Sequence, residues 1–199
     1  MTDNLYRQKL INSILYFARE TSHLNLTKLF KLLNFFDFEH FAETGYPAIG
    51  LKYVTWKRGP VPRQLWHDLK DGQPPTDIGK FVATTVKYRE YDKDSHEVEI
   101  KTRPGAKPNM DVFTPREQHL LEKLAYIYKD ATAKQMSEIS HEDEKPWRLT
   151  MDEYGENAEI DYMLAHKEDS PISEDEARQS LNEHWAAISA LELDPMDMD

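Results

Sequence analysis

Asp37 and His40 come closest, by type and spacing, to a catalytic or metal-binding pair. They stand three positions apart in a segment with helical periodicity, so both side chains would lie on one face of a helix. A carboxylate and an imidazole could supply half of a metal site. A stable site usually needs three or four ligands, and no second helical histidine is present. The pattern therefore favours a hydrogen-bonded pair that orients a core helix.

A second polar cluster, His141-Glu142-Asp143-Glu144, carries the donor atoms of a hard-cation site. It has neither the spacing nor the glycine of an EF-hand, and Lys145 breaks the His-Glu-x-x-His pattern of zinc proteases. We expect a solvated acidic loop here. His184 and Trp185 are expected to pack on a C-terminal helix, with Trp185 in its buried stripe and His184 at the border.

Other chemistry is excluded by motif. The chain has no cysteine, which rules out disulfides, thiolate metal sites and cysteine nucleophiles. Its glycines form no phosphate-binding loop, and no serine lies in a GxSxG elbow. The sequence therefore predicts a protein that is not an enzyme and holds no cofactor or metal. A metal-dependent hydrolase built on scattered carboxylates is the less favoured alternative.

The segment from Trp56 to Trp66 is the strongest candidate for a binding surface. It carries two tryptophans and three cations around prolines that stiffen the chain. A stiff segment loses little entropy on binding, and Trp and Arg are frequent interface anchors. The predicted partner-binding residues are Trp56, Lys57, Arg58, Pro60, Arg63 and Trp66. The alternative is that both tryptophans belong to the core and the prolines shape a turn, with only the cations exposed.

Charge is distributed unevenly along the chain. The 199 residues have a formal net charge of −11; residues 1–110 hold 17 basic and 13 acidic residues, whereas residues 111–199 hold 8 and 23. An anionic half repels phosphate backbones and attracts basic protein surfaces. We therefore expect no nucleic-acid partner, although helices over 115–128 and 132–140 leave a helix-turn-helix regulator as an alternative. The acidity could also serve solubility alone.

The central element is predicted at 26–44, where leucine and phenylalanine cover nearly the whole circumference of a helix. A helix that is apolar on all sides is buried on all sides, and Gly45 would end it. Further helices are predicted over 4–20, 63–70, 115–128, 132–140 and 173–191, with an irregular acidic stretch over 141–172. The segment 51–56 suits a short strand, and residues 81–90 and 96–102 alternate as a β-hairpin.

These elements predict an α+β fold, mainly α-helical: a compact helical domain around the buried helix 26–44, with a small antiparallel β-hairpin. No apolar run approaches 18 residues, so no membrane span is expected. The first 25 residues carry charges on a helical pattern instead of the apolar block of a signal peptide. Together with the lack of cysteine, this favours the cytoplasm.

One set of residues resembles a family signature. It comprises the helical segment from Lys28 to Phe41, then Thr44-Gly45, the run Gly50-Leu51-Lys52-Tyr53-Val54-Thr55-Trp56, Gly59-Pro60-Val61-Pro62, and later Leu121, Ser140-His141 and Pro146-Trp147. The most specific part is Tyr-x-x-Trp-x-x-Gly-Pro-Val-Pro. Over about residues 5–150 the chain resembles the Panacea domain, the SocA-like antitoxin domain of bacterial and phage toxin–antitoxin systems.

The resemblance implies a mostly helical domain that neutralises a partner toxin by direct binding, the toxin being encoded next to it. The chain would then divide into three parts. Residues 1–150 form the Panacea-like domain, residues 151–191 form an acidic extension ending in a helix packed on that domain, and residues 192–199 form a disordered acidic tail. Either the 56–66 segment or the acidic C-terminal region could contact the toxin. The alternative is a phage or host protein-interaction adaptor with the same domain and no toxin.

Overall fold

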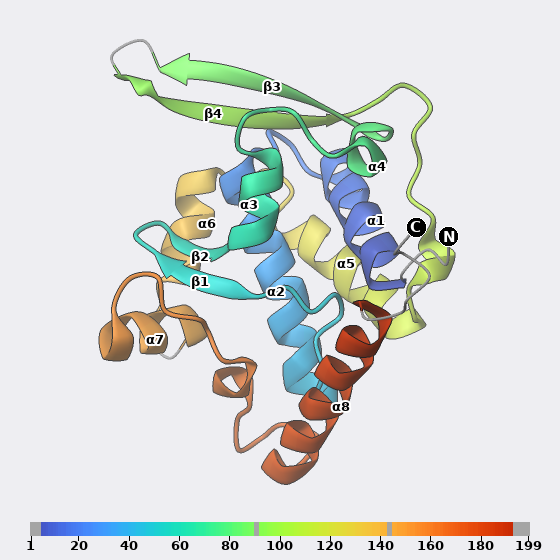
Figure 1. Ribbon diagram of the computed structural model, residues 1–199, viewed down its shortest axis with the longest axis vertical. Coiled ribbons are helices and arrows are strands. Elements are labelled where there is room, and N and C mark those ends of the chain that lie inside the picture. Colours follow the sequence, from blue (N-terminus) through green and yellow to red (C-terminus); the bar gives the residue numbers. More distant parts are fainter. Residues whose placement is uncertain (1–4, 90–91, 143–144, 193–199) are drawn as a thin grey trace.

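Helix α2 (Leu26–Thr44) runs through the middle of the molecule in the computed structural model, which describes residues 5–89, 92–142 and 145–192 (Figure 1). Its phenylalanines and leucines are buried on every face, as the sequence predicts. Asn25 caps its first turn by accepting a bond from the Lys28 amide at 2.9 Å. Gly45, at φ +82°, ends it in the left-handed conformation. The predicted central helix is confirmed.

Three helices pack around α2. They are α1 (Leu5–Glu20), α5 (Pro115–Ile127) and α6 (Ala133–Ser140). The capping boxes Thr114–Glu117 and Thr132–Gln135 begin α5 and α6. The main core gathers apolar residues from these helices and from the strands, among them Leu10, Ile14, Phe17, Leu29, Leu32, Leu33, Phe36, Val98, Ile100, Leu121, Leu124 and Met136.

The described structure contains two antiparallel hairpins. Strands β3 (Val82–Arg89) and β4 (Asp92–Thr102) form the predicted hairpin. Strands β1 (Tyr53–Trp56) and β2 (Gly59–Pro62) form a second hairpin. The sequence pattern predicted only the strand over 51–56, because two prolines so close together indicate a stiff segment and not a paired strand. Prolines lack the N–H that a strand donates, but an edge strand tolerates them. The α+β, mainly helical class is confirmed.

The remaining helices are short except for the last. They are α3 (Arg63–Leu69), α4 (Thr76–Gly79), the 3-10 turns η1 (Met110–Val112) and η2 (Tyr162–Ala165), α7 (Pro146–Tyr154) and α8 (Glu174–Glu192). The expectation of an irregular 141–172 stretch was wrong at α7. Its apolar residues are too few to show a helical period, and it is ordered by tertiary burial of Trp147 and Thr150.

The segment after α7 joins the edge of β1. Asn157 N donates to Thr55 O at 2.7 Å, Thr55 N to Ala158 O at 2.9 Å, and Ile160 N to Tyr53 O at 2.9 Å. Residues 157–160 therefore extend the β1–β2 hairpin by strand-like pairing. This pairing ties the acidic C-terminal region to the central part of the fold.

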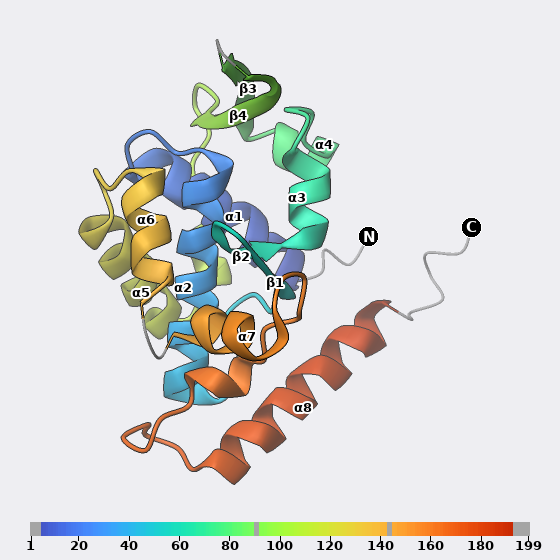
Figure 2. The same cartoon turned by 90° about the vertical axis from the view of Figure 1, so that its left-hand side faces the viewer.

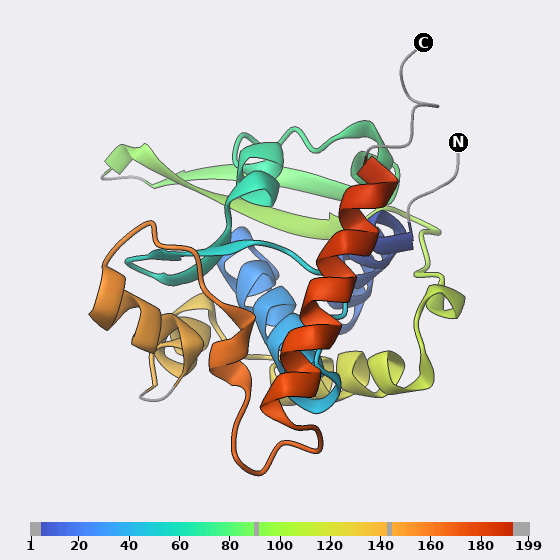
Figure 3. The same cartoon turned by 60° about the horizontal axis from the view of Figure 1, so that its bottom comes forward.

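Helix α8 lies across one side of the molecule (Figure 3). Ala177, Leu181 and His184 are its buried residues, and Trp185 is only half-buried. The expected order of His184 and Trp185 was therefore wrong: the histidine lies inward. A Cβ built on Gly50 would come within 2.5 Å of His184 Nε2, so the loop backbone approaches α8 closely. The predicted disordered tail lies outside the described residues, apart from Glu192 at the end of α8.

Truncation after Leu191 is expected to leave the melting temperature within about 2 °C of that of the full chain, because the sequence of the removed tail, with four acids and no base, predicts that it forms no part of the core. Truncation after Ser173 is the matched control. It removes the buried Ala177 and Leu181 and should lower the melting temperature clearly. Thermal unfolding followed by circular dichroism compares the two, and a large loss in the shorter deletion would contradict the expectation.

Candidate functional site

A cleft of about 1000 Å³ opens where several elements meet. Its lining comes from the N-terminal part of α2, the β1–β2 turn, α3, β4, α6 and the residues after α7. These elements lie together on the left of Figure 1, and Figure 2 shows α3 and α6 flanking α2 when that side faces the viewer. Segments far apart in the sequence therefore build one concave surface.

Four of the six predicted partner-binding residues line this cleft. They are Trp56, Lys57, Arg58 and Trp66. The two tryptophans are half-buried and pack edge to face, with ring centroids 4.9 Å apart. Each tryptophan thus packs partly against the core and partly lines the cleft.

The other two predicted residues lie elsewhere. Pro60 is buried, and its carbonyl accepts a bond from Lys31 Nζ at 3.1 Å. Arg63 is exposed at the start of α3 and does not line the cleft. Proximity in sequence to Trp56 and Trp66 therefore does not decide which residues face the concave surface.

The β1–β2 turn presents two cations. Lys57 and Arg58 are exposed, and neither forms an ion pair with any residue in the described ranges. The turn is held from α6, because Ser137 Oγ donates to Arg58 O at 3.2 Å. Gly59 adopts φ +105°, a left-handed conformation that only glycine takes readily. The turn therefore displays two unpaired charges on a fixed backbone.

Lys31 also lines the cleft, although it was not among the residues predicted from the sequence. The residue is 1% exposed and makes no ion pair within the part of the chain that the structure describes. Burial lowers the pKa of its ammonium to about 7. A Cβ on Gly59 would lie 2.6 Å from Lys31 Nζ, so glycine makes room for the lysine. One signal in the sequence could have indicated this residue: Lys31 lies between leucines and phenylalanines in the predicted buried helix, where a charge is unexpected.

Asp37 is a structural residue. Its Oδ1 accepts bonds from the amides of Ile49 at 2.6 Å and Gly50 at 3.2 Å, and its Oδ2 accepts from Leu51 N at 3.2 Å and Tyr53 Oη at 3.0 Å. Burial raises the pKa of this carboxyl, while the three backbone bonds oppose that rise. Asp37 therefore anchors the loop that follows α2, and it does not line the cleft.

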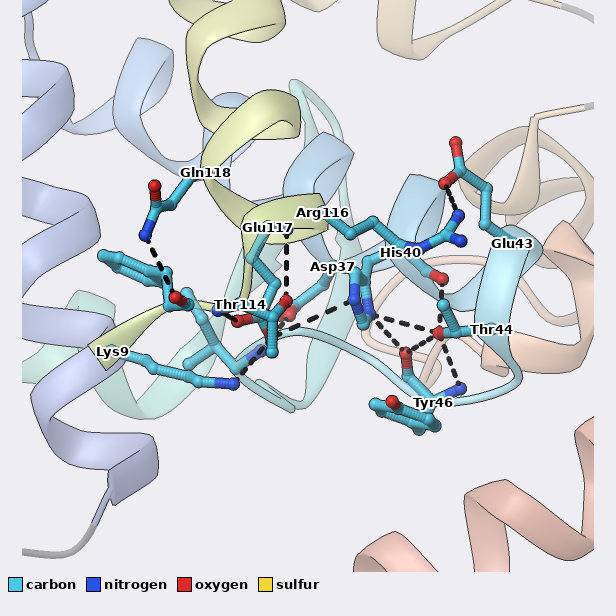
Figure 4. Close-up of polar contacts among 12 residues, drawn as sticks. Lys9, Asp37, His40, Glu43, Thr44, Tyr46, Thr114, Arg116, Glu117 and Gln118 are labelled. Atoms are coloured by element: carbon cyan, nitrogen blue, oxygen red, sulfur yellow. Dashed lines mark hydrogen bonds and ion pairs between the residues drawn. The ribbon is translucent and has the colours of Figure 1, made fainter. Parts of the chain in front are cut away.

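His40 lies in a separate buried network with Lys9 and Glu117 (Figure 4). Lys9 Nζ lies 2.6 Å from Glu117 Oε1, and His40 Nε2 lies 3.9 Å from the same oxygen. His40 Nδ1 donates to Tyr46 O at 2.9 Å. Burial lowers the His40 pKa, while the bond to Tyr46 and the charge of Glu117 oppose the shift. Asp37 and His40 thus orient the core helix through loop 46–51, not through a bond to each other.

No group of three His, Asp or Glu side chains in the described ranges could hold a metal ion. The predicted acidic loop is described only in part, since residues 143 and 144 lie outside those ranges. His141 is half-buried there and stacks on Trp147, with ring centroids 3.9 Å apart.

The structure gives little support to the alternative of a DNA-binding helix-turn-helix. Gln135 on α6 would be a base-reading residue, but its side chain already accepts a bond from Thr132 N in the capping box of that helix. None of the described helices is both long enough and apolar enough to cross a membrane.

The residues of the predicted family signature meet in space. Tyr53 donates to Asp37, and Trp147 Nε1 donates to Trp56 O at 3.1 Å. Gly59 and Pro60 enclose the end of Lys31. The signature thus specifies how the loop after α2, the β1–β2 hairpin and α7 pack on the central helix. It fixes the frame of the cleft.

Comparison with known proteins agrees with this pattern. Residues 29–148 match the family model described as antitoxin SocA-like, Panacea domain. No curated protein and no solved structure matches the chain. Since the family model covers more than half of the 199 residues, the chain belongs to the SocA-like antitoxin family that carries the Panacea domain.

Proposed function

We propose that the protein is a cytoplasmic antitoxin that neutralises a cognate toxin, encoded next to it, by binding the toxin directly in the cleft. The observation that carries this proposal is the placement of Trp56, Trp66, Lys57 and Arg58 on one concave surface of about 1000 Å³. Aromatic and cationic side chains in a concave site are typical of residues that dominate binding energy. Membership of an antitoxin family supplies the class of partner.

The rigidity of the surface supports the proposal. Ser137 holds the carbonyl of Arg58, and Lys31 holds that of Pro60, so two other helices fix the turn. Trp56 Nε1 donates to Asn157 Oδ1 at 3.1 Å, which fixes the indole. A surface that is already ordered loses little conformational entropy on association.

The test is co-expression with the product of the neighbouring reading frame, followed by growth measurement and affinity pull-down. The parent chain should restore growth and retain the toxin. The double variant Lys57→Glu/Arg58→Glu should weaken binding at least about tenfold, because it reverses both unpaired charges. Arg63→Glu is the matched control: it reverses an exposed cation that lies outside the cleft lining and should neutralise like the parent.

Two outcomes would contradict the proposal. If the parent chain left the neighbouring product fully toxic, the antitoxin function would be wrong. If Arg63→Glu weakened binding as much as the double variant, the cleft would not be the contact surface. A non-toxic neighbour together with a partner encoded elsewhere would favour the interaction adaptor instead.

A further inference from the structure

We propose that the toxin segment entering the cleft is acidic and that one of its carboxylates docks beside Lys31. This inference rests on the proposed function of the cleft and adds the chemistry of the occupant. It reverses the expectation from net charge, under which an acidic chain of charge −11 would attract a basic partner. The lining of the cleft carries more basic than acidic residues, so the cleft itself favours an acidic ligand.

The lining of the cleft is cationic. It includes Lys31, Lys57, Arg58, Lys70 and Lys134, against the carboxylates of Glu97 and Glu156. Two of these cations have local partners: Lys70 lies 2.6 Å from Asp71, and Lys134 lies 3.8 Å from Glu138. Glu97 accepts a bond from Asn25.

The three uncompensated cations gather at one place. Lys57 and Arg58 form the β1–β2 turn, and Lys31 reaches the carbonyl of Pro60 directly after that turn. No described residue supplies a carboxylate to any of the three. An anionic group of the partner is the chemistry that complements such a site.

Lys31 is the most informative of the three. Its ammonium can donate three bonds, and Pro60 O accepts the only side-chain bond found for it among the described residues. A buried cation without a counter-charge costs stability, and an apolar residue of similar volume would avoid that cost. The single bond to Pro60 O stabilises the fold by less than the burial of the unpaired charge costs, so we expect that binding and not folding requires the group.

A protein segment fits this cleft better than a nucleic acid. Glu97 and Glu156 stand on the same lining, and a phosphate backbone crossing the cleft would meet both. A peptide can place a carboxylate at Lys31 and uncharged residues beside the two glutamates. Trp56 and Trp66 pack against each other at 75°, which does not offer the parallel faces on which successive bases stack.

The test uses the full chain and three fluorescein-labelled probes at low salt: decaglutamate, decalysine and a ten-residue oligothymidylate. We expect decaglutamate to bind most tightly. Lys31→Met should weaken its binding about tenfold and at the same time raise the midpoint of thermal unfolding. A purely structural lysine would give the opposite result, with lower stability on substitution. Arg63→Glu is again the control and should change binding little.

Binding should also depend on pH. Because burial holds the Lys31 pKa near 7, a docking carboxylate must raise it and binding takes up a proton. Affinity should therefore be highest below pH 7 and fall as pH rises toward 9, and Lys31→Met should abolish this slope. The charged and titratable groups beside Lys31 include Lys57 and Arg58 on the turn and His141 at the end of α6, whose pKa is lowered chiefly by burial and next by the charge of Lys31. His96→Gln controls for the imidazole on β4 that also lines the cleft.

The outcomes separate this inference from the proposed function. If the toxin binds in the cleft while decaglutamate does not, the acidic occupant is wrong and the antitoxin function stands. Tighter binding of the oligothymidylate would overturn the inference in favour of a nucleic acid. Unchanged decaglutamate binding by Lys31→Met would overturn the role of Lys31. If decaglutamate binds through Lys31 but no toxin partner exists, the acidic-ligand site is supported and the antitoxin function is wrong.

Discussion

Phe36→Asp is expected to yield no folded protein. Phe36 is fully buried in the middle of α2, where its ring lies 6.2 Å from that of Phe113 in an edge-to-face arrangement. The substitution removes a core phenylalanine, which costs about 3–5 kcal/mol, and buries an unpaired carboxylate, which costs several more. The sum reaches the whole stability of a typical domain, about 5–15 kcal/mol.

Near-ultraviolet circular dichroism and thermal unfolding measure the effect. Phe81→Asp is the matched control, because Phe81 is exposed and its replacement should leave cooperative unfolding in place. A soluble Phe36→Asp protein that unfolds cooperatively would show that α2 is not the centre of the core.

Asp37→Ala should cost about 4 kcal/mol of unfolding free energy. The change leaves the amides of Ile49, Gly50 and Leu51 without their acceptor, and each unsatisfied buried donor costs about 1–3 kcal/mol. Asp77→Ala is the control, since its ion pair with Arg7 is half-exposed and should be worth less than about 1 kcal/mol. Chemical denaturation of the two variants gives the comparison, and equal losses would contradict a structural role for Asp37.

Asp37→Asn refines the same prediction. Tyr162 Oη lies 2.6 Å from Leu51 O and 3.2 Å from Asp37 Oδ2, and its single proton serves one of these two acceptors at a time. The same Asp37 oxygen also accepts from Leu51 N and Tyr53 Oη. An asparagine keeps one side-chain oxygen as acceptor for the amides of Ile49 and Gly50, so we expect a loss of about 2 kcal/mol, smaller than for alanine. Equal losses for the two variants would contradict a stabilising role for these two bonds.

Local signals in the sequence were sufficient for most of the helices. The phenylalanine-rich pattern, Gly45 and the capping boxes at Thr114 and Thr132 act within a few residues, and the structure places α2, α5 and α6 where they indicate. The β3–β4 hairpin followed from strict alternation. Helix caps depend on local backbone preferences, and a helical or strand period requires only that one face of the element is buried. Both can therefore be recognised within a short stretch of sequence.

The cleft depended on contacts between distant segments. Lys31 donates to Pro60 O, Ser137 donates to Arg58 O, and Trp56 donates to Asn157 although 101 positions separate them. No periodicity or motif encodes such meetings. The sequence could therefore indicate Trp56 to Trp66 as a candidate binding segment, but only the packed chain distinguishes Arg58, which lines the cleft, from Arg63, which does not.

The pairing of residues 157–160 with β1 has a practical consequence for mapping the interaction. The family match stops at residue 148, and a fragment cut there would lose the backbone partners of Tyr53 and Thr55. It would also expose a bare strand edge, which invites self-association. Failure of such a fragment to rescue growth would therefore not locate a toxin contact, because aggregation and the loss of Glu156 and Asn157 from the cleft lining would both produce it. Deletion scanning should therefore begin at the far end of α8, and binding residues are better located by point substitution in the intact chain.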